Sequence, residues 1–329
     1  MELAWRLARR LGDGRFHSGQ TLASELGVSR STVWNALQGL RDRGLQVHAV
    51  RRKGYRLPEP VSWLAEDRVR AAVPGPLRER VAIEVLPETD STNNRLLALP
   101  PPAPGSARAC LAEYQNVGRG RRGRRWWCPP GAGICLSLAW QFDRPPPDLS
   151  ALSVVAGLAV RQSLLSIGFE EVMLKWPNDL LAEARKLGGL LVELRAEGNG
   201  PCHVVIGVGI NHRLPASLEG KIRQEGGLAP IDLVSICRED PQDRNVVAGN
   251  LIGDLMERLN RFAVEGARTL VADWRSADAL SGRVITVDTG GRRLSGRAAG
   301  IDKDGALRVE LDDRIERITA GDVSVRLAP

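Results

Sequence analysis

The residues best suited to chemistry gather in one ten-residue stretch, Gly118–Trp127, with the sequence GRGRRGRRWW. Its three glycines allow the backbone to approach a ligand closely. Its five arginines suit a phosphate or a carboxylate, because one guanidinium group can donate to two oxygens at once. The two tryptophans can cover a flat or apolar partner. An anion-binding loop is one interpretation, and a solvated basic loop or nucleic-acid patch is the other.

The glycine spacing by itself is misleading. Gly118, Gly120 and Gly123 match the G-x-G-x-x-G pattern of dinucleotide-binding loops, which lie between a strand and a helix. A strand is predicted before them, over Ala107–Tyr114, but Arg124–Gly131 contains two prolines and a glycine and cannot begin a helix. The sequence also has no G-x-x-x-x-G-K-[ST] phosphate loop. We therefore predict an anion-binding loop of another kind.

Further polar groups follow the ends of other predicted strands: Ser91–Asn93, Gln115, Lys175–Asp179, Lys186 and Gly207–Asn211. No Ser-His-Asp or Cys-His arrangement accompanies them, and the four histidines are scattered along the chain. Cations, amides and one Asp suit the binding of a nucleotide and an acid, and the stabilisation of charge as phosphate departs. Arginine is the usual cation of this chain, yet two of its five lysines fall within one short segment, Lys175–Lys186.

Length and composition indicate a globular protein of two or three domains, since 329 residues with 43% hydrophobic content can form sizeable cores. The first residues lack a signal-peptide core, and no stretch is expected to span a bilayer. We expect a cytoplasmic protein with no membrane partner. The five cysteines include no CxxC pair and are expected to be reduced thiols rather than metal ligands.

Residues 1–60 are predicted to form a basic winged helix-turn-helix domain. They hold eleven Lys and Arg against five Asp and Glu, whereas the other 269 residues hold 35 against 34. A first helix carries Leu3, Leu7 and Leu11, and Gly27 supplies the tight turn between the next two. A helical hairpin for protein contact is the alternative to DNA binding. The residues expected to contact DNA are Ser29, Arg30, Ser31, Thr32, Asn35, Gln38, Arg51, Arg52 and Lys53.

The remainder is predicted to form two further domains of an α+β multidomain chain. Residues 61–277 alternate strands and helices and form the central α/β domain, with an apolar helix over Leu149–Ile167 as its buried element. Residues 278–329 contain five short β-like runs separated by turns, which predicts a small SH3-like β-barrel.

Five motifs follow one another along the chain: Ser91-Thr92-Asn93, the Gly118–Trp127 loop, Lys-Trp-Pro-Asn-Asp at 175–179, Lys-Leu-x-Gly-x-Leu-x-Glu from Lys186, and Gly-x-Gly-x-Asn ending at Asn211. In this order of motifs the chain resembles biotin–protein ligases, and with the winged helix it resembles the bifunctional biotin ligase and biotin-operon repressor. The resemblance covers nearly the whole chain. It implies a central ligase domain built on a mixed sheet like that of class II synthetases.

The resemblance implies an ATP-dependent, AMP-forming reaction in two steps. Biotin and MgATP give biotinyl-5′-AMP and pyrophosphate, and a lysine of the biotin carboxyl carrier protein of acetyl-CoA carboxylase then accepts biotin. The implied catalytic residues are Lys186 and Arg121. The implied biotin site is Ser91, Thr92, Asn93, Gln115, Arg119, Gly120, Arg121 and Lys186. The implied nucleotide site is Arg121, Arg124, Trp127, Lys175, Asn178, Asp179 and Asn211, with Asp179 as a candidate Mg²⁺ ligand.

The resemblance also implies that an adenylate-bound homodimer binds operator DNA of the biotin biosynthesis operon and represses it. Three alternatives stay open: a ligase without active repression, a ligand-sensing transcription factor without enzyme activity, and a lipoate-type ligase. One position departs from the family, because Ile318 stands where a tryptophan can cover the adenine. An aliphatic side chain stacks less well, so a smaller C-terminal contribution to nucleotide binding is expected.

Overall fold

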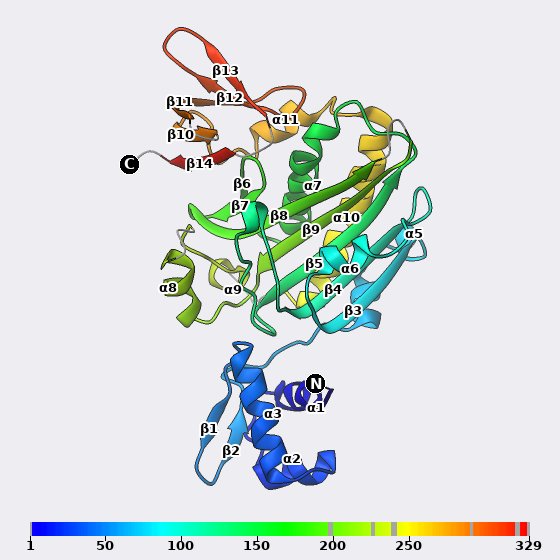
Figure 1. Cartoon of the computed structure of the whole chain (residues 1–329), viewed down its shortest axis with the longest axis vertical. Coiled ribbons are helices and arrows are strands. Elements are labelled where there is room, and N and C mark those ends of the chain that lie inside the picture. The colour runs from blue at the N-terminus through cyan, green and yellow to red at the C-terminus, as the bar shows by residue number, and fades with distance from the viewer. Residues whose placement is uncertain are drawn as a thin grey trace.

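The computed structural model describes residues 2–196, 200–224, 228–237, 242–289, 292–319 and 323–327. Figure 1 shows the N-terminal elements below a large central sheet and the C-terminal strands above it. The N-terminal part is the predicted winged helix-turn-helix. Its elements are α1 Glu2–Leu11, α2 Gly19–Leu26, α3 Arg30–Asp42, β1 His48–Val50 and β2 Gly54–Arg56.

Local sequence explains the two helix starts and the turn of this motif. The Ser18 hydroxyl accepts from the backbone N–H of Thr21, and the Ser29 hydroxyl accepts from that of Thr32, so each serine caps its helix. Gly27 adopts φ 66°, the left-handed conformation that ends α2. Leucines of α1, α2 and α3, the recognition helix of this motif, form a separate small core.

The central domain contains a seven-stranded mixed sheet in the order β3-β4-β5-β9-β8-β7-β6. β3 and β4 are parallel, and every other neighbouring pair in this sheet is antiparallel. The predicted strands are confirmed. They are β3 Val81–Thr89, β4 Ala107–Gln115, β5 Gly133–Phe142, β6 Met173–Lys175, β7 Asp179–Ala182, β8 Arg185–Ala196 and β9 Cys202–Asn211.

Helices cover both faces of this sheet. The larger helices on one face enclose the main core, and α6 covers a smaller cluster around Leu96 and Cys110 on the other (Figure 1). On the main face lie α4 Glu66–Ala72, α5 Gly75–Arg78, α7 Leu152–Ser166, α10 Arg244–Glu265 and α11 Leu270–Arg275. The remaining helices are α6 Thr92–Leu97, η1 Arg121–Gly123, η2 Leu149–Ala151, α8 Ser217–Gln224 and α9 Leu233–Ile236.

The expectation that no stretch could span a bilayer was wrong as stated. Leu149–Ser166 is long and apolar enough to do so by length and composition alone. Most of this segment is buried inside the protein, however, because α7 packs against both the sheet and α10, which lies beside it on the same face. The apolar character of α7 is therefore that of a core helix, as the prediction of a buried central helix requires.

The C-terminal strands form a five-stranded antiparallel sheet in the order β13-β12-β11-β10-β14. Among the described residues no pairing joins β13 to β14, so the closed SH3-like barrel stays a prediction. The strands are β10 Val284–Thr289, β11 Arg292–Ile301, β12 Leu307–Glu310, β13 Ile315–Ile318 and β14 Val323–Leu327. The predicted turn at Gly290-Gly291 lies outside the described residues.

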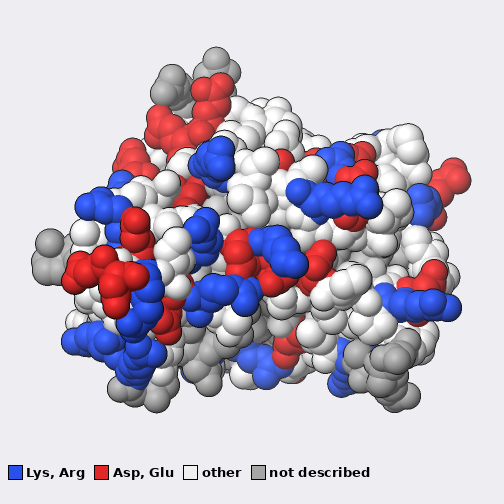
Figure 2. Space-filling model, turned by 90° about the horizontal axis from the view of Figure 1, so that it is seen from above, with Lys and Arg blue, Asp and Glu red and all other residues white. Residues whose placement is uncertain are grey.

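The surface of the upper part of the molecule carries both signs of charge. Figure 2 shows this face, where Lys and Arg lie among Asp and Glu. Arg317 illustrates the pairing, since its guanidinium group lies 2.7 Å from Asp304 and also contacts Asp302. Residues 61–329 thus have almost no net charge, and their opposite charges lie close together. The excess positive charge lies in the winged helix.

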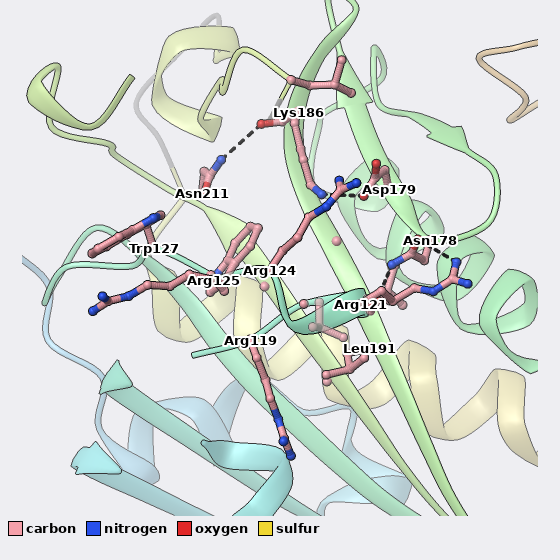
Figure 3. Close-up of a pocket in the computed structure, with 18 of the residues that line it drawn as sticks. Arg119, Arg121, Arg124, Arg125, Trp127, Asn178, Asp179, Lys186, Leu191 and Asn211 are labelled. Atoms are coloured by element: carbon pink, nitrogen blue, oxygen red, sulfur yellow. Dashed lines mark hydrogen bonds and ion pairs between the residues drawn. The ribbon is translucent and has the colours of Figure 1, made fainter. Parts of the chain in front are cut away.

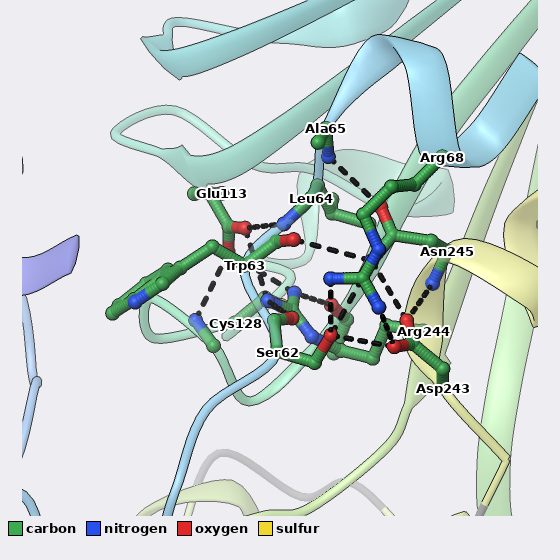
Figure 4. A network of polar contacts seen from close by, with 12 residues as sticks. Ser62, Trp63, Leu64, Ala65, Arg68, Glu113, Cys128, Asp243, Arg244 and Asn245 are labelled. Carbon is green, nitrogen blue, oxygen red and sulfur yellow. Dashed lines mark hydrogen bonds and ion pairs between the residues drawn. The ribbon is translucent and has the colours of Figure 1, made fainter. Parts of the chain in front are cut away.

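A buried ion pair joins three parts of the chain: the linker at Ser62–Leu64 that follows the winged helix, the central sheet and the long helix α10. Both guanidinium nitrogens of Arg244 donate to the carboxylate of Glu113, at 2.9 and 3.0 Å, and both side chains are buried. Glu113 also accepts from the backbone N–H groups of Leu64 and Gly131. Arg244 donates in addition to the carbonyls of Ser62 and Gly133 (Figure 4).

We predict that Arg244→Met destabilises the central domain by about 3–5 kcal/mol, because it leaves the buried Glu113 carboxylate without its cation. Chemical denaturation followed by tryptophan fluorescence measures the effect. Arg95→Met is the control, since the Arg95–Glu84 pair is exposed and is expected to contribute about 1 kcal/mol or less. Equal losses in the two variants would contradict a special role for the buried pair.

Candidate functional site

A cavity of about 610 Å³ lies on the side of the sheet covered by the Gly118–Trp127 loop. It brings together every residue predicted to bind biotin or nucleotide. These are Ser91, Thr92, Asn93, Gln115, Arg119, Gly120, Arg121, Arg124, Trp127, Lys175, Asn178, Asp179, Lys186 and Asn211. They come from strand ends and loops far apart in sequence. The cavity is large enough for a small organic ligand and a nucleotide moiety.

The Gly118–Trp127 loop folds as a short hairpin over this cavity. The backbone N–H of Trp126 donates to Gly118 at 2.8 Å, and that of Gly120 donates to Arg124 at 2.7 Å. At its tip Gly123 has φ 69°, and a Cβ on Gly118 would lie 2.8 Å from the Trp126 carbonyl. These two glycines are thus required by the loop's own fold. Figure 3 shows its arginines pointing in different directions.

One end of the cavity is a chain of hydroxyl and amide groups. The Gln115 carbonyl oxygen accepts from the backbone N–H of Thr92 at 2.8 Å and from its hydroxyl at 3.1 Å. The Ser137 hydroxyl lies 2.7 Å from that of Thr92 and 2.5 Å from the Asn93 carbonyl oxygen. The Asn93 amide donates to Glu193 at 2.7 Å. Because these groups hold one another in place, this end is a preorganised set of donors and acceptors.

The other end is a cluster of two lysines and one aspartate. The Lys186 ammonium lies 2.6 Å from one oxygen of Asp179, and the Lys175 ammonium lies 3.6 Å from the other (Figure 3). Burial by itself would raise the pKa of Asp179, but the two ammonium groups hold that pKa below its usual value. Burial lowers the pKa of Lys175, and Lys186 adds to the effect. The site is thus a partly desolvated cation pair that favours an anion.

Two arginines of the loop reach different neighbours. The Arg121 guanidinium donates to the Asn178 carbonyl oxygen at 3.5 Å, which ties the loop to the lysine end. Arg119 extends away from the lysine cluster in Figure 3 and contacts Asn94 and Glu193. Asn178 in turn donates to the Leu190 carbonyl at 2.6 Å. Arg121 therefore bridges the loop and the turn that carries Asp179.

Asn211 has a structural contact that its motif did not reveal. Its side-chain amide donates to the backbone carbonyls of Lys186, at 3.2 Å, and Ile231, at 3.0 Å. Figure 3 shows the first of these bonds. Asn211 thereby positions the backbone from which the Lys186 side chain extends.

Sequence reasoning gave Ser137 and Glu193 no role in this site, and it expected Trp126 to cover a ligand and not to pack on a strand. Ser137 lies inside a continuous apolar strand, and Glu193 ends a motif without an assigned role. The Trp126 ring packs on Gly209, where an added Cβ would lie 2.5 Å from it. Gly207 and Gly209 are the one indication that the sequence offers, because glycines within a strand mark a place where another group packs closely against the backbone.

Trp127 lies between two cations at the rim of the cavity. The Arg125 guanidinium is 3.6 Å from the ring centroid and the Lys221 ammonium is 3.7 Å from it. Lys221 belongs to α8, so this contact joins the loop to that helix.

Ile318 does not lie at the cavity. It is buried in the main hydrophobic core and is not among the residues that line the cavity. The residues after it in the aligned stretch, Ala320 and Gly321, lie outside the described residues. Within the described part of the chain, position 318 thus stabilises the packing of the C-terminal sheet.

The predicted DNA-contacting residues lie on two exposed elements. Arg30, Ser31 and Asn35 are exposed on α3, and Thr32 and Gln38 are partly exposed. Ser29 is also the helix cap, so its hydroxyl is already engaged with Thr32. Arg51, Arg52 and Lys53 form the exposed turn between β1 and β2. The basic turn and the recognition helix are the two contact elements of a winged helix.

We predict that Asp179→Asn lowers stability at neutral pH, because it leaves two neighbouring ammonium groups without their counter-ion. The pKa of Asp179 is lowered in the folded state, so its contribution is complete above the unfolded value and is lost as pH falls through the folded pKa. The difference in the free energy of unfolding between wild type and variant should therefore decrease as pH falls from about 6 to about 3. Denaturation midpoints across this range measure it, and a constant gap would contradict the assignment.

Comparison with known proteins agrees with this geometry. Residues 85–211 match the Biotin/lipoate A/B protein ligase family, residues 7–56 match an HTH domain, and residues 280–326 match the Biotin protein ligase C terminal domain. The chain is 38% identical to the Bifunctional ligase/repressor BirA of Salmonella typhimurium, over 97% of this chain and 96% of the relative. The Escherichia coli protein of the same name is 37% identical, over 98% and 97%.

A solved structure supports the same assignment. The biotin protein ligase from Aquifex aeolicus, in complex with biotin and ATP, superposes with a TM-score of 0.62 at 25% identity, covering 75% of this chain and 99% of that one. The part of this chain left uncovered is a quarter of its length. Together with relatives that share nearly the full chain, these matches show that this protein belongs to the biotin protein ligase family, as one of its bifunctional ligase/repressors.

Proposed function

We propose that this ligase condenses biotin with ATP to biotinyl-5′-AMP and pyrophosphate, and then transfers biotin to a lysine of the biotin carboxyl carrier protein of acetyl-CoA carboxylase. The observation that carries this proposal is a single cavity with a hydroxyl–amide end and a two-lysine end. A ligand with a polar ring and a carboxylate is complementary to both ends at once. A mixed anhydride forms where its carboxylate meets the α-phosphate of a nucleotide.

The hydroxyl–amide end is proposed to hold the ureido ring of biotin. The ring presents N–H donors and a carbonyl acceptor, which match Ser91, Thr92, Asn93 and Gln115. These groups are buried or half-buried and already oriented. The loop residues Arg119, Gly120 and Arg121 are proposed to close over the biotin side of the cavity, as their place along its lining allows.

Lys186 and Arg121 are proposed to stabilise the charge that builds up at the acyl phosphate. The Lys186 ammonium is paired with Asp179 in this structure, and a negatively charged ligand offers it an alternative partner. Holding cations where charge develops is the main means of catalysis in phosphoryl and adenylyl transfer. Arg124, Trp127, Lys175, Asn178, Asp179 and Asn211 are proposed to surround the nucleotide.

Mg²⁺ is the proposed counter-ion of ATP, but the protein groups do not form a cage for it. Among the described residues that line the cavity Asp179 is the one carboxylate, and both of its oxygens face lysines. No cluster of three His, Cys, Asp or Glu suited to a metal is present in the described part of the chain. We therefore propose that the metal arrives with the ATP phosphates, which matches its preference for phosphate and water oxygens, with Asp179 as its nearest protein ligand.

We predict that Lys186→Ala reduces biotin-dependent exchange of pyrophosphate into ATP by about 100- to 1,000-fold, the usual cost of losing one charge-stabilising donor. Labelling of a carrier domain by biotin should fall in parallel. Lys303→Ala is the matched control, because Lys303 is an exposed lysine in the turn between β11 and β12, and it should keep wild-type exchange. Undiminished exchange in Lys186→Ala would remove Lys186 from its role, and exchange with lipoate instead of biotin would favour the lipoate-type alternative.

The winged helix is proposed to act with a second copy of the chain as a repressor. Its basic charge and exposed α3 support binding of operator DNA at the biotin biosynthesis operon, in a homodimer that forms when the adenylate is bound. We place the domain boundaries at 1–60, 61–277 and 278–329, which contain the three family matches. ATP, carrier protein and DNA are all cytoplasmic, and the described cysteines are free thiols.

We predict that the protein shifts a duplex from the upstream region of its own biotin operon only when biotin and ATP, or biotinyl-5′-AMP, are present. Sedimentation of the same samples should show dimers under the same conditions, because two recognition helices must present themselves to a symmetric site. Equal binding with and without adenylate would contradict ligand control. Carrier labelling without any shift would identify a ligase that does not repress.

A further inference from the structure

A tryptophan stands exposed on the recognition helix. Trp34 is 52% exposed, and it lies in the first half of α3 between the predicted contact residues Arg30 and Gln38. Among the described residues no ring contact or cation–π contact involves Trp34. A large apolar ring on a surface is a marker of an interaction site when its surroundings share that function.

The geometry of α3 places Trp34 on an exposed side of the helix, next to the buried stripe. Val33, Leu37 and Leu40 are buried against α1 and α2, so they define the inner stripe. Residues four apart share one face of a helix, which aligns Arg30, Trp34 and Gln38 along this side of α3. In Figure 1, α3 and the β1–β2 wing lie at the end of the molecule remote from the C-terminal sheet.

The surroundings of Trp34 favour nucleic acid over a protein partner. Arg30 precedes it by one helical turn, and the wing adds the exposed turn Arg51–Lys53. Protein interfaces are depleted of charged residues at their centres, whereas DNA interfaces are strongly positive. An apolar ring framed by cations and by hydrogen-bonding side chains such as Asn35 fits the edge of a base pair between two phosphate backbones.

We propose that Trp34 reads the 5-methyl group of thymine in the major groove, and so sets part of the sequence preference of this repressor. The inference rests on the proposed binding of operator DNA. Thymine is the one base that presents a methyl group there, and apolar side chains recognise it by contact. Indole offers the largest apolar surface available to this helix face. Arg30, Asn35 and the wing supply the hydrogen bonds and phosphate contacts that hold the helix in register.

The test is a cycle that combines a protein variant with a DNA variant. Full-length protein with biotinyl-5′-AMP first selects its preferred duplex from a random library, and each thymine of that duplex is then replaced by deoxyuridine, which lacks only the methyl group. Loss of one buried methyl contact is expected to weaken wild-type binding roughly fourfold, and the symmetric pair roughly 15-fold. Trp34→Ala should bind more weakly and should be indifferent to uracil at those positions.

Matched variants separate the methyl contact from general effects. Asn35→Ala removes a neighbouring contact and should keep the sensitivity to uracil. Trp34→Leu retains an apolar side chain and should keep part of it. Val264→Ala removes an apolar side chain that is 85% exposed on α10, and should bind as wild type does. Carrier labelling by each variant reports that the ligase domain is intact.

Two outcomes would overturn the inference. If Trp34→Ala responds to uracil as wild type does, or if no uracil substitution weakens wild type, Trp34 does not read thymine. A change in the dimerisation of Trp34→Ala without a change in uracil sensitivity would assign the ring to contact with a second copy. Failure of wild type to select any duplex would refute the proposed repressor function, and it is distinguishable because it appears before any variant is made.

Discussion

The buried pair between Glu113 and Arg244 is the interaction on which the arrangement of this molecule depends. A carboxylate and a guanidinium group removed from water are stable only if every lone pair and donor finds a partner. Here the partners are backbone groups of the linker, at Ser62 and Leu64, and of the segment after the arginine loop, at Gly131 and Gly133. Four separate segments are held because one charge pair has to be satisfied.

The segments that this pair holds lead to both the cavity and the winged helix. Gln115, which organises the hydroxyl–amide end of the cavity, lies two residues beyond Glu113 on the same strand. On the other side, the Pro129 ring lies so close to Gly44, after α3, that an added Cβ there would be 3.1 Å from it, and Arg43 forms an ion pair with Glu88 at 2.9 Å. The segment that follows the Gly118–Trp127 loop therefore lies directly against the winged helix.

The site illustrates which interactions follow from local sequence. The arginine loop, Lys175–Asp179 and Lys186 were predictable, since glycine spacing, charge and the scarcity of lysine mark them without knowledge of the fold. Ser137 and Glu193 were not, because both acquire their partner, Asn93, from α6, which is remote from them in sequence. Tertiary structure also decides how two segments are interpreted. α7 has the length and composition of a spanning segment, and Ile318 stands where the family can carry a tryptophan, but both are buried in the main core.

The sequence by itself determined the order of the elements, the winged helix and its basic charge, the strands of the sheet and the chemical kind of the ligand. Periodicity, capping serines and turn glycines act over a few residues, so they can be recognised from the sequence alone. Only the tertiary structure decided which polar groups meet, how Asp179 is shared between two lysines, and that Trp34 faces outward. Those outcomes depend on burial and on distances between strands that are remote in sequence, and these are set only when the chain folds and packs its core.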